Sequence, residues 1–144
     1  LRQEIEHVRQ YLFIQKERYG DKLEYEIDEP DDIPDIKLPK IVLQPLVENA
    51  IYHGIKESER PGKITITVSK RDTFIDICIA DNGVGIKENT TNTKELGGVG
   101  IKNIQERLAL FFGEAFSMEI ESETNAYTKV YLHLPLKEEG HANS

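Results

Sequence analysis

The sequence predicts a two-layer α/β (α+β) sandwich, in which a mixed, mostly antiparallel five-stranded sheet has three helices on one face. Five segments alternate apolar and polar residues, the period of two that is typical of a strand with one buried face. Three longer segments repeat apolar residues every three or four positions, as amphipathic helices do. Because the strands are one-faced, we expect all the helices to pack on the same side of the sheet.

Composition limits the size of the protein and its partners. The 144 residues, 38% of them hydrophobic, suit one domain of ordinary size with its own core. No run approaches the ~20 apolar residues of a membrane span. The formal net charge of −8 argues against non-specific binding to nucleic acid.

The first predicted helix covers residues 1–19 and ends at Gly20. Its narrow apolar stripe, typical of a bundle or coiled coil, consists of Leu1, Ile5, Val8 and Leu12. Because the chain starts inside this pattern, we expect residues 1–20 to continue a helix of a longer parent protein. A first strand follows at residues 23–27, and the acidic, proline-containing residues 28–35 form a loop.

A second helical pattern runs over residues 38–54 and is interrupted by Pro45. Proline lacks the backbone N–H and clashes with the preceding turn, so we expect a kink or a restart near Gln44 with Pro45 in a first turn. One face contains Val42, Leu46, Asn49 and His53. Glu48 lies one residue around the helix, and Gly54 ends it.

Asn49 is a polar residue on an apolar helix face and therefore needs a partner. Two interpretations remain open. The side chain is either an ordinary helix asparagine bonded to backbone, or its amide oxygen binds a hard cation such as Mg²⁺, which prefers oxygen ligands.

Asp81 ends an alternating strand at residues 74–80, which pairs as a hairpin with a strand at residues 64–68. Period-two alternation places Asp81 on the face of the strand's isoleucines, where an unpaired carboxylate is costly. Gly83 and Gly85 follow it and allow close backbone approach. The pattern fits either a common acidic strand end before a glycine turn or a carboxylate that recognises a polar ligand.

Residues 87–96 contain almost no apolar side chain and predict a mobile loop. The glycine-rich residues 97–100 then open a third helix, which Gly113 ends. Free N–H groups and the helix dipole make such an entry suitable for an anion. A dinucleotide-binding fingerprint is rejected, because Asn103 stands at its third position and no strand immediately precedes it. The apolar face of this helix consists of Ile101, Ile104, Leu108 and Phe111/Phe112.

Two last strands are predicted at residues 116–120 and 128–134, followed by a polar tail, 137–144, that we expect to be disordered. Thr128 begins the inward row of the fifth strand. It is either an ordinary strand threonine or a contact for the ligand that Asp81 recognises. Asp81, Asn49, Thr128 and the glycine-rich helix entry can converge between the layers. Such a set offers a carboxylate for a base amine, an amide for a metal and N–H groups for phosphates, which together indicate a nucleoside triphosphate.

Three segments resemble the motifs of the GHKL ATPases. Leu46–Gly54 is similar to their N box, Asp81–Ile86 to their G1 box and Gly98–Ile101 to their G2 box. More narrowly, Gln44–Ile51 and Tyr11–Leu23 resemble sensor histidine kinases of the LytS/YesM type. The resemblance extends over nearly all of residues 1–136.

The resemblance implies a Bergerat fold that binds Mg²⁺–ATP, with residues 21–136 as the ATP-binding catalytic domain. By position, Asn49 would ligate Mg²⁺, and Asp81 would accept the adenine amine with Thr128 nearby. Residues 87–96 would be the ATP lid. The remaining nucleotide contacts would come from His53, Gly83, Gly85, Ile86, Gly98, Gly100 and Ile101.

Two departures from the family pattern bear on the chemistry. Hydrolysing GHKL proteins have a carboxylate one helical turn before the metal-binding asparagine, where this chain has Pro45. Glu48 is then the candidate base or metal helper. The family's phosphoacceptor segment, a histidine followed by phenylalanine after Asn-Pro, is absent, because His7 precedes Val8. We expect that segment upstream.

The implied function is transfer of the ATP γ-phosphoryl to a histidine outside this chain and from there to an aspartate of a response regulator. The implied parent is a homodimer joined through upstream dimerisation and phosphoacceptor helices, with this domain on the cytoplasmic side of a membrane-anchored bacterial sensor. One alternative is a nucleotide-binding scaffold without transfer activity. Another, an ATP-hydrolysing protein, is disfavoured by Pro45.

Overall fold

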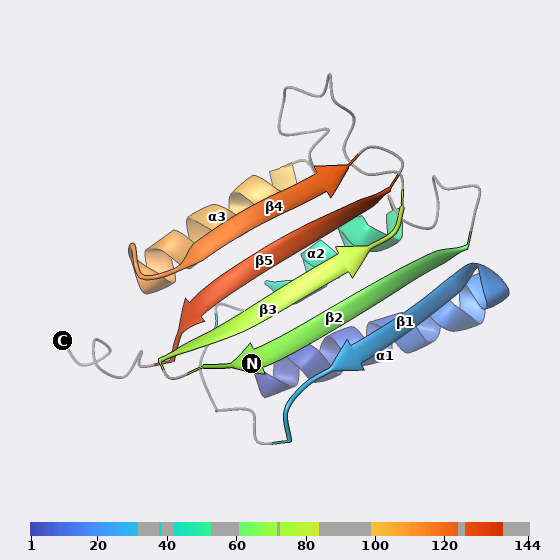
Figure 1. Cartoon of the computed structure of the whole chain (residues 1–144), viewed down its shortest axis with the longest axis horizontal. Coiled ribbons are helices and arrows are strands. Elements are labelled where there is room, and N and C mark those ends of the chain that lie inside the picture. The colour runs from blue at the N-terminus through green and yellow to red at the C-terminus, as the bar shows by residue number, and fades with distance from the viewer. Residues whose placement is uncertain are drawn as a thin grey trace.

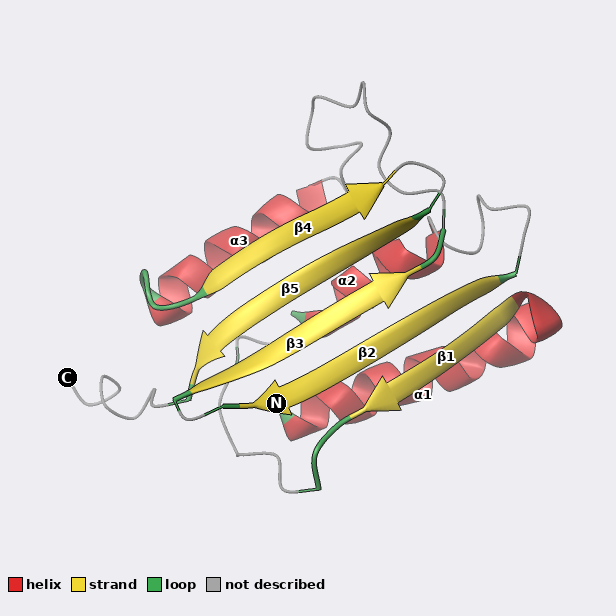
Figure 2. Cartoon of the chain, in the orientation of Figure 1, coloured by secondary structure: helices red, strands yellow, loops and turns green. Residues whose placement is uncertain are grey.

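The computed structural model describes residues 1–31, 38, 42–52, 61–71, 73–83, 99–123 and 126–136. Within them, a five-stranded sheet forms one layer and three α-helices cover one of its faces (Figure 1). Figure 2 shows the same two layers by secondary structure, with every helix behind the sheet. The predicted fold class is confirmed.

Helix α1 covers Arg2–Tyr19 and buries the predicted stripe of Ile5, Val8 and Leu12. Gly20 ends it with a φ of 59°, a left-handed conformation that glycine adopts without steric cost. A short 3₁₀ turn, Gly20–Lys22, leads into strand β1, Leu23–Asp28. Lys16 connects these pieces, because its Nζ donates to the carbonyls of Gly20 (3.0 Å) and Leu23 (2.6 Å).

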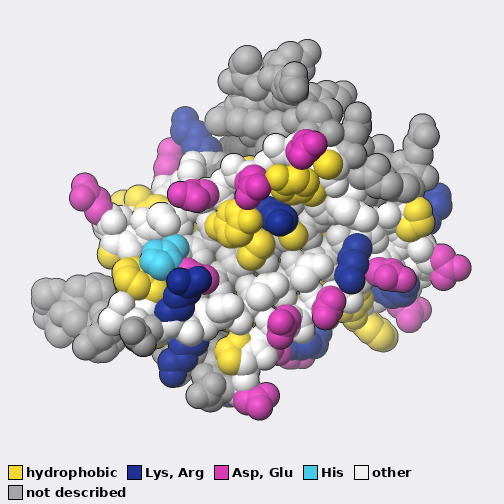
Figure 3. All heavy atoms as spheres, in the orientation of Figure 1, with side chains coloured by type: hydrophobic (Ala, Val, Ile, Leu, Met, Phe, Trp, Pro, Cys, Tyr) yellow, Lys and Arg dark blue, Asp and Glu magenta, His cyan; other side chains and the backbone are white. Residues whose placement is uncertain are grey.

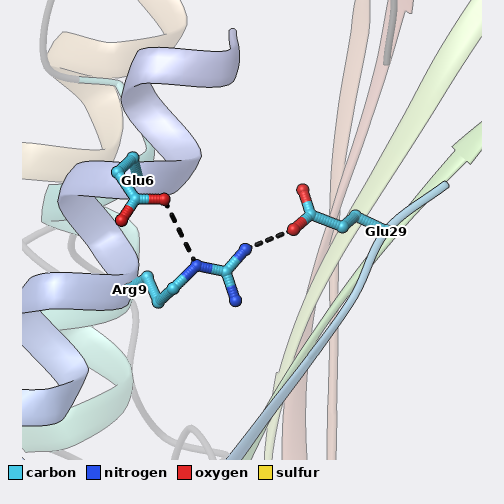
Figure 4. Close-up of polar contacts among 3 residues, drawn as sticks. All are labelled: Glu6, Arg9 and Glu29. Atoms are coloured by element: carbon cyan, nitrogen blue, oxygen red, sulfur yellow. Dashed lines mark hydrogen bonds and ion pairs between the residues drawn. The ribbon is translucent and has the colours of Figure 1, made fainter. Parts of the chain in front are cut away.

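An ion-pair group also joins α1 to the sheet (Figure 4). Arg9 on α1 pairs with Glu29, just beyond β1, and its Nε lies 3.4 Å from Oε1 of Glu6 on its own helix. The Arg9–Glu29 ion pair links α1 to the end of β1, which is an edge strand of the sheet.

Helix α2 covers Leu43–Ile51, which corrects the predicted start at residue 38. Leu38 lies outside any helix, and residues 39–41 are outside the described part of the chain. Helix α2 begins next to the predicted break near Gln44, and Pro45 lies in its first turn as predicted, where a missing N–H leaves no intrahelical bond unmade.

Glu4 of α1 caps α2. The side chain of Val42, at the N-cap position, makes no capping hydrogen bond. Instead the Glu4 carboxylate accepts from the backbone N–H of Leu43 (3.0 Å) and of Val42 (3.4 Å). A negative charge at a helix N-terminus also interacts favourably with the helix dipole.

The other strands are β2 (Gly62–Lys70), β3 (Phe74–Asp81), β4 (Ser117–Glu123) and β5 (Tyr127–Pro135). The sheet order is β1-β2-β3-β5-β4, with β1 parallel to β2 and every other pair antiparallel. The β1–α2–β2 crossover makes the parallel pair possible. Every strand is longer than predicted; β2, for example, begins at Gly62, which already pairs with Leu23. Phe116, which was predicted in the fourth strand, precedes β4.

The core lies between the sheet and the helices. Helix α3, Val99–Phe112, buries Ile104, Leu108 and Phe112 against it. Phe111 differs from the prediction: it is 38% exposed and meets Phe112 edge to face at 4.8 Å between ring centroids. The inward rows of the central strands are buried as predicted and consist of Ile64, Ile66, Val68, Ile75, Ile77, Ile79, Val130, Leu132 and Leu134. Within the described ranges, no helix has the length and apolar character needed to cross a membrane.

Candidate functional site

Two of the predicted site residues, Asp81 and Thr128, lie at the end of the sheet where β3 ends and β5 begins (Figure 1). The last turn of α2 and the first turn of α3 lie at this same end, behind the strands (Figure 1). Helix α2 contacts both β3 and α3. The topology therefore brings Asn49, Asp81, Thr128 and the start of α3 to one edge of the molecule.

Asp81 ends the inward row of β3 and is 6% exposed. The backbone N–H of Gly83 donates to its Oδ1 at 2.9 Å. This bond offsets part of the cost of burying the carboxylate. The same bond closes the glycine turn, as expected for an acidic strand end that shapes its own turn. Asp81 also faces the layer between sheet and helices, as expected for a carboxylate that recognises a ligand. Both interpretations therefore retain support.

Asn82 attaches the chain beyond Asp81 to β2. Its side-chain Oδ1 accepts from the Lys63 backbone N–H at 2.8 Å, and its own N–H donates to the Lys63 carbonyl at 3.3 Å. Asn82 thereby fixes the position at which the chain leaves the sheet after Asp81.

Thr128 lies directly opposite Asp81 in the pairing of β3 with β5. Directly opposed residues on one face have Cβ atoms about 4.5–5.5 Å apart. The next strand adds Ser122, which pairs with Thr128 and whose Oγ lies 3.3 Å from Thr128 Oγ1. A row of three polar side chains, Asp81–Thr128–Ser122, therefore crosses three strands on the helix-covered face.

Ser122 belongs to this polar row, and the sequence prediction did not include it. Alternation from Met118 and Ile120 places it on the inward face of β4, and this signal was available in the sequence. Its position opposite Thr128 depends on the register between β4 and β5, which alternation alone does not specify.

Asn49 lies half-buried in the last turn of α2, whereas Glu48 is exposed. The Glu48 carboxylate accepts from Gln44 Nε2 at 3.1 Å. It also lies near Tyr11 of α1: burial raises the pKa of the Tyr11 hydroxyl above its ordinary value, and the Glu48 charge raises it further. Glu48 thus faces the seam between α1 and α2, on a different side of α2 from Asn49.

Several predicted residues lie outside the described part of the chain: His53, Gly85, Ile86, Gly98 and the loop 87–96. Gly100 is the second residue of α3, and the side chain of Ile101 is not described. Their roles stay predictions.

The described side chains at this end suit a hard cation that takes only one or two ligands from the protein. Among the described residues, no three His, Cys, Asp or Glu side chains are grouped to hold a metal ion. Asn49 contributes one amide oxygen. Mg²⁺ typically takes one or two protein oxygens and completes its shell with water and substrate phosphates, so this donor set fits Mg²⁺ delivered with a nucleotide.

A concavity lies on the opposite, open face of the sheet, which Figure 3 shows as a mixture of apolar, acidic and basic side chains. Its volume is about 580 Å³, and its lining includes Arg71, Asp76, Cys78 and His133. Asp76 pairs with His133 and with Arg71 Nε at 2.7 Å, and Phe74 stacks on His133 with ring centroids 4.1 Å apart. None of the predicted site residues lines this hollow, so the inward row is the stronger candidate.

Known proteins resemble this chain in sequence and in fold. The profile of the family described as histidine kinase-, DNA gyrase B-, and HSP90-like ATPase matches residues 35–138. Sensor histidine kinase YesM of Bacillus subtilis is 33% identical over 139 residues, covering 96% of this chain and 24% of that protein. Sensor histidine kinase BtsS of Escherichia coli is 34% identical over 139 residues, with the same coverage. Sensor protein LytS of Oceanobacillus iheyensis is 33% identical over 147 residues, covering 95% and 25%.

Solved structures with the same fold are also histidine kinase domains. The catalytic domain of histidine kinase ThkA superposes with a TM-score of 0.69 at 20% identity, covering 93% of this chain and 92% of that one. Histidine kinase AdeS of Acinetobacter baumannii gives a TM-score of 0.67 at 17% identity, covering 92% and 63%. The chain spans about a quarter of the length of the curated relatives it matches. It belongs to the histidine kinase-, DNA gyrase B-, and HSP90-like ATPase family.

Proposed function

We propose that this chain binds Mg²⁺–ATP and presents the γ-phosphoryl for transfer to a histidine outside residues 1–144. The observation that supports this most directly is the pairing of Asp81 with Thr128 on the helix-covered face, at the end where α2 and α3 meet the sheet. A buried carboxylate beside a hydroxyl suits the amino-bearing edge of adenine, because both groups can accept hydrogen bonds from it.

The other groups take the roles that the resemblance to the family implies. Asn49 is the proposed Mg²⁺ ligand. Gly83 and Gly85 shape the adenine side, and Gly98 and Gly100 allow the start of α3 to approach the phosphates. His53, Ile86 and Ile101 complete the proposed set of ATP contacts, and residues 87–96 would cover the nucleotide.

Phosphoryl transfer is favoured over hydrolysis by the surroundings of Asn49. Pro45, one turn earlier on α2, has no group that activates water. Glu48 faces α1 and interacts with Gln44. We retain Glu48 as a proposed base or metal helper, since transfer to a histidine depends mainly on positioning and charge neutralisation.

The proposed partners follow from the relatives, which are named sensor histidine kinases and span about four times this length. The parent would supply dimerisation and phosphoacceptor helices, act as a homodimer anchored in a membrane with this domain in the cytoplasm, and pass the phosphoryl group to a response regulator. A scaffold that binds nucleotide without transfer is the alternative. To distinguish these two hypotheses, this chain is mixed with γ-³²P-ATP and a full-length parent whose own nucleotide site is inactivated. Transfer predicts that label reaches the histidine of the parent, and a scaffold predicts that it does not.

The metal role of Asn49 predicts a magnesium-dependent defect. Asn49→Ala should weaken ATP binding about tenfold or more with Mg²⁺ present, since it removes a direct ligand, and change it little in EDTA. Isothermal titration calorimetry with ATP measures both affinities. Asn103→Ala, at an exposed position on α3, is the matched control. An equal loss with and without Mg²⁺ would contradict metal ligation.

A further inference from the structure

The hydroxyl of Ser122 makes two contacts that constrain where protons can lie. Ser122 Oγ donates to the carbonyl oxygen of Tyr127 at 3.0 Å. The same oxygen lies 3.3 Å from Thr128 Oγ1, in a contact that either hydroxyl could donate. A carbonyl oxygen can only accept, whereas each hydroxyl has one proton to donate.

Only one arrangement of the two hydroxyl protons makes both contacts hydrogen bonds. If Ser122 gives its proton to Tyr127, Ser122 must accept from Thr128. The single proton of Thr128 then points along the sheet toward β4. The lone pairs of Thr128 remain for a group placed over the sheet, next to the carboxylate of Asp81 on the neighbouring strand.

Building on the proposed nucleotide site, we propose that Ser122 is a positioning residue that makes Thr128 an acceptor and so determines which base the site admits. Asp81 and Thr128 then form a wall of acceptors. Such a wall favours a purine whose six-position carries an amino group, which donates. It disfavours a purine with a carbonyl there, whose oxygen would face acceptors directly or through an ordered water.

Ser122→Ala tests the inference, with ATP and inosine triphosphate as probes. The variant frees the Thr128 proton, so Thr128 can rotate and donate to a carbonyl base. The ratio of ATP to inosine triphosphate affinity should fall by about three- to tenfold, in keeping with one misdirected hydrogen bond. Ser122→Thr, which retains the hydroxyl, should restore the ratio.

Two further variants separate an effect on the direction of the Thr128 proton from a general loss of protein stability. Ser117→Ala removes a hydroxyl from the same strand on the open face and should leave the ratio unchanged. Thr128→Val removes the acceptor itself. It should also lower the ratio, and adding Ser122→Ala to it should have no further effect, which keeps the test informative if Ser122→Ala alone folds poorly.

The outcomes are distinct. Equal weakening of both nucleotides in Ser122→Ala, an unchanged ratio, or additive losses in the double variant would overturn the role of Ser122 while leaving the nucleotide site intact. Failure of the wild-type chain to bind either nucleotide would overturn the proposed function, and this inference with it.

Discussion

At the scale of single residues, short-range hydrogen bonds fix the turn that follows β3. Gly83 donates to Asp81 at 2.9 Å, and Asn82 is attached to Lys63 on β2. Such preorganisation reduces the entropy lost on binding. Asp81 can therefore act as a recognition residue without a large rearrangement of its own turn.

The sequence predicted Asp81 and Thr128 correctly as inward residues because side-chain alternation in a strand has a fixed period. The sequence prediction missed Ser122, because its contact with Thr128 depends on the register between β4 and β5. Strand register is a tertiary property that alternation does not specify. Helix periodicity correctly placed Glu48 on a different side of α2 from Asn49, but the neighbour that Glu48 meets there depends on α1 packing beside α2.

Glu121 gives a pH prediction on the open side of the same strand pair. The hydroxyls of Tyr127 and Tyr131 donate to its carboxylate at 2.8 and 3.1 Å and lower its pKa below the ordinary value. A lowered folded-state pKa adds stability above the unfolded-state pKa of about 4.3, and this stability is lost as pH falls through the folded value. Wild type should therefore lose stability between about pH 5 and 3 more steeply than a variant carrying Tyr127→Phe and Tyr131→Phe.

Urea unfolding at a series of pH values measures this slope. Parallel pH profiles for the wild type and the double variant would show that the two hydroxyls do not perturb Glu121.

At the scale of elements, α2 is a short helix that depends on its neighbours. It has nine residues and no side-chain cap of its own. Isolated helices of this length are marginal in water, so packing against α1, β3 and α3 must supply most of its stability. Its start was predicted five residues too early, because the cap that defines it comes from Glu4, far away in the sequence.

Removing this cap should destabilise the fold and the site together. Glu4→Ala leaves the first N–H groups of α2 without their carboxylate and should lower the free energy of unfolding by about 1 kcal/mol. Glu4→Gln, which keeps an acceptor without the charge, should cost less. Chemical denaturation at neutral pH measures both.

Gln10→Ala, at an exposed position on α1, is the control for changes in α1 itself. Equal stabilities for Glu4→Ala and Gln10→Ala would show that the Glu4 carboxylate contributes nothing to α2.

At the scale of the whole molecule, a one-faced sheet forces the site to share its face with the helices. The alternating strands predicted this layer order, and the structure confirms it. The β1–α2–β2 crossover brings the end of α2 to the end of β3, and the antiparallel β3–β5 pair adds Thr128 there. The loop before α3, with Gly85, Ile86 and Gly98, lies outside the described residues, so that half of the site rests on its resemblance to the family.

The central claim is that the inward row around Asp81 binds the base of ATP. Calorimetric titration of Mg²⁺–ATP into the wild-type chain, Asp81→Asn and Asp76→Asn tests it most directly. Asp76 lies on the same strand but on the open face, so it controls for loss of a β3 carboxylate. We expect Asp76→Asn to bind like wild type and Asp81→Asn to bind at least about tenfold more weakly, the scale of one charged hydrogen bond. Unchanged affinity in Asp81→Asn, or equal losses in both variants, would contradict the assignment of this site.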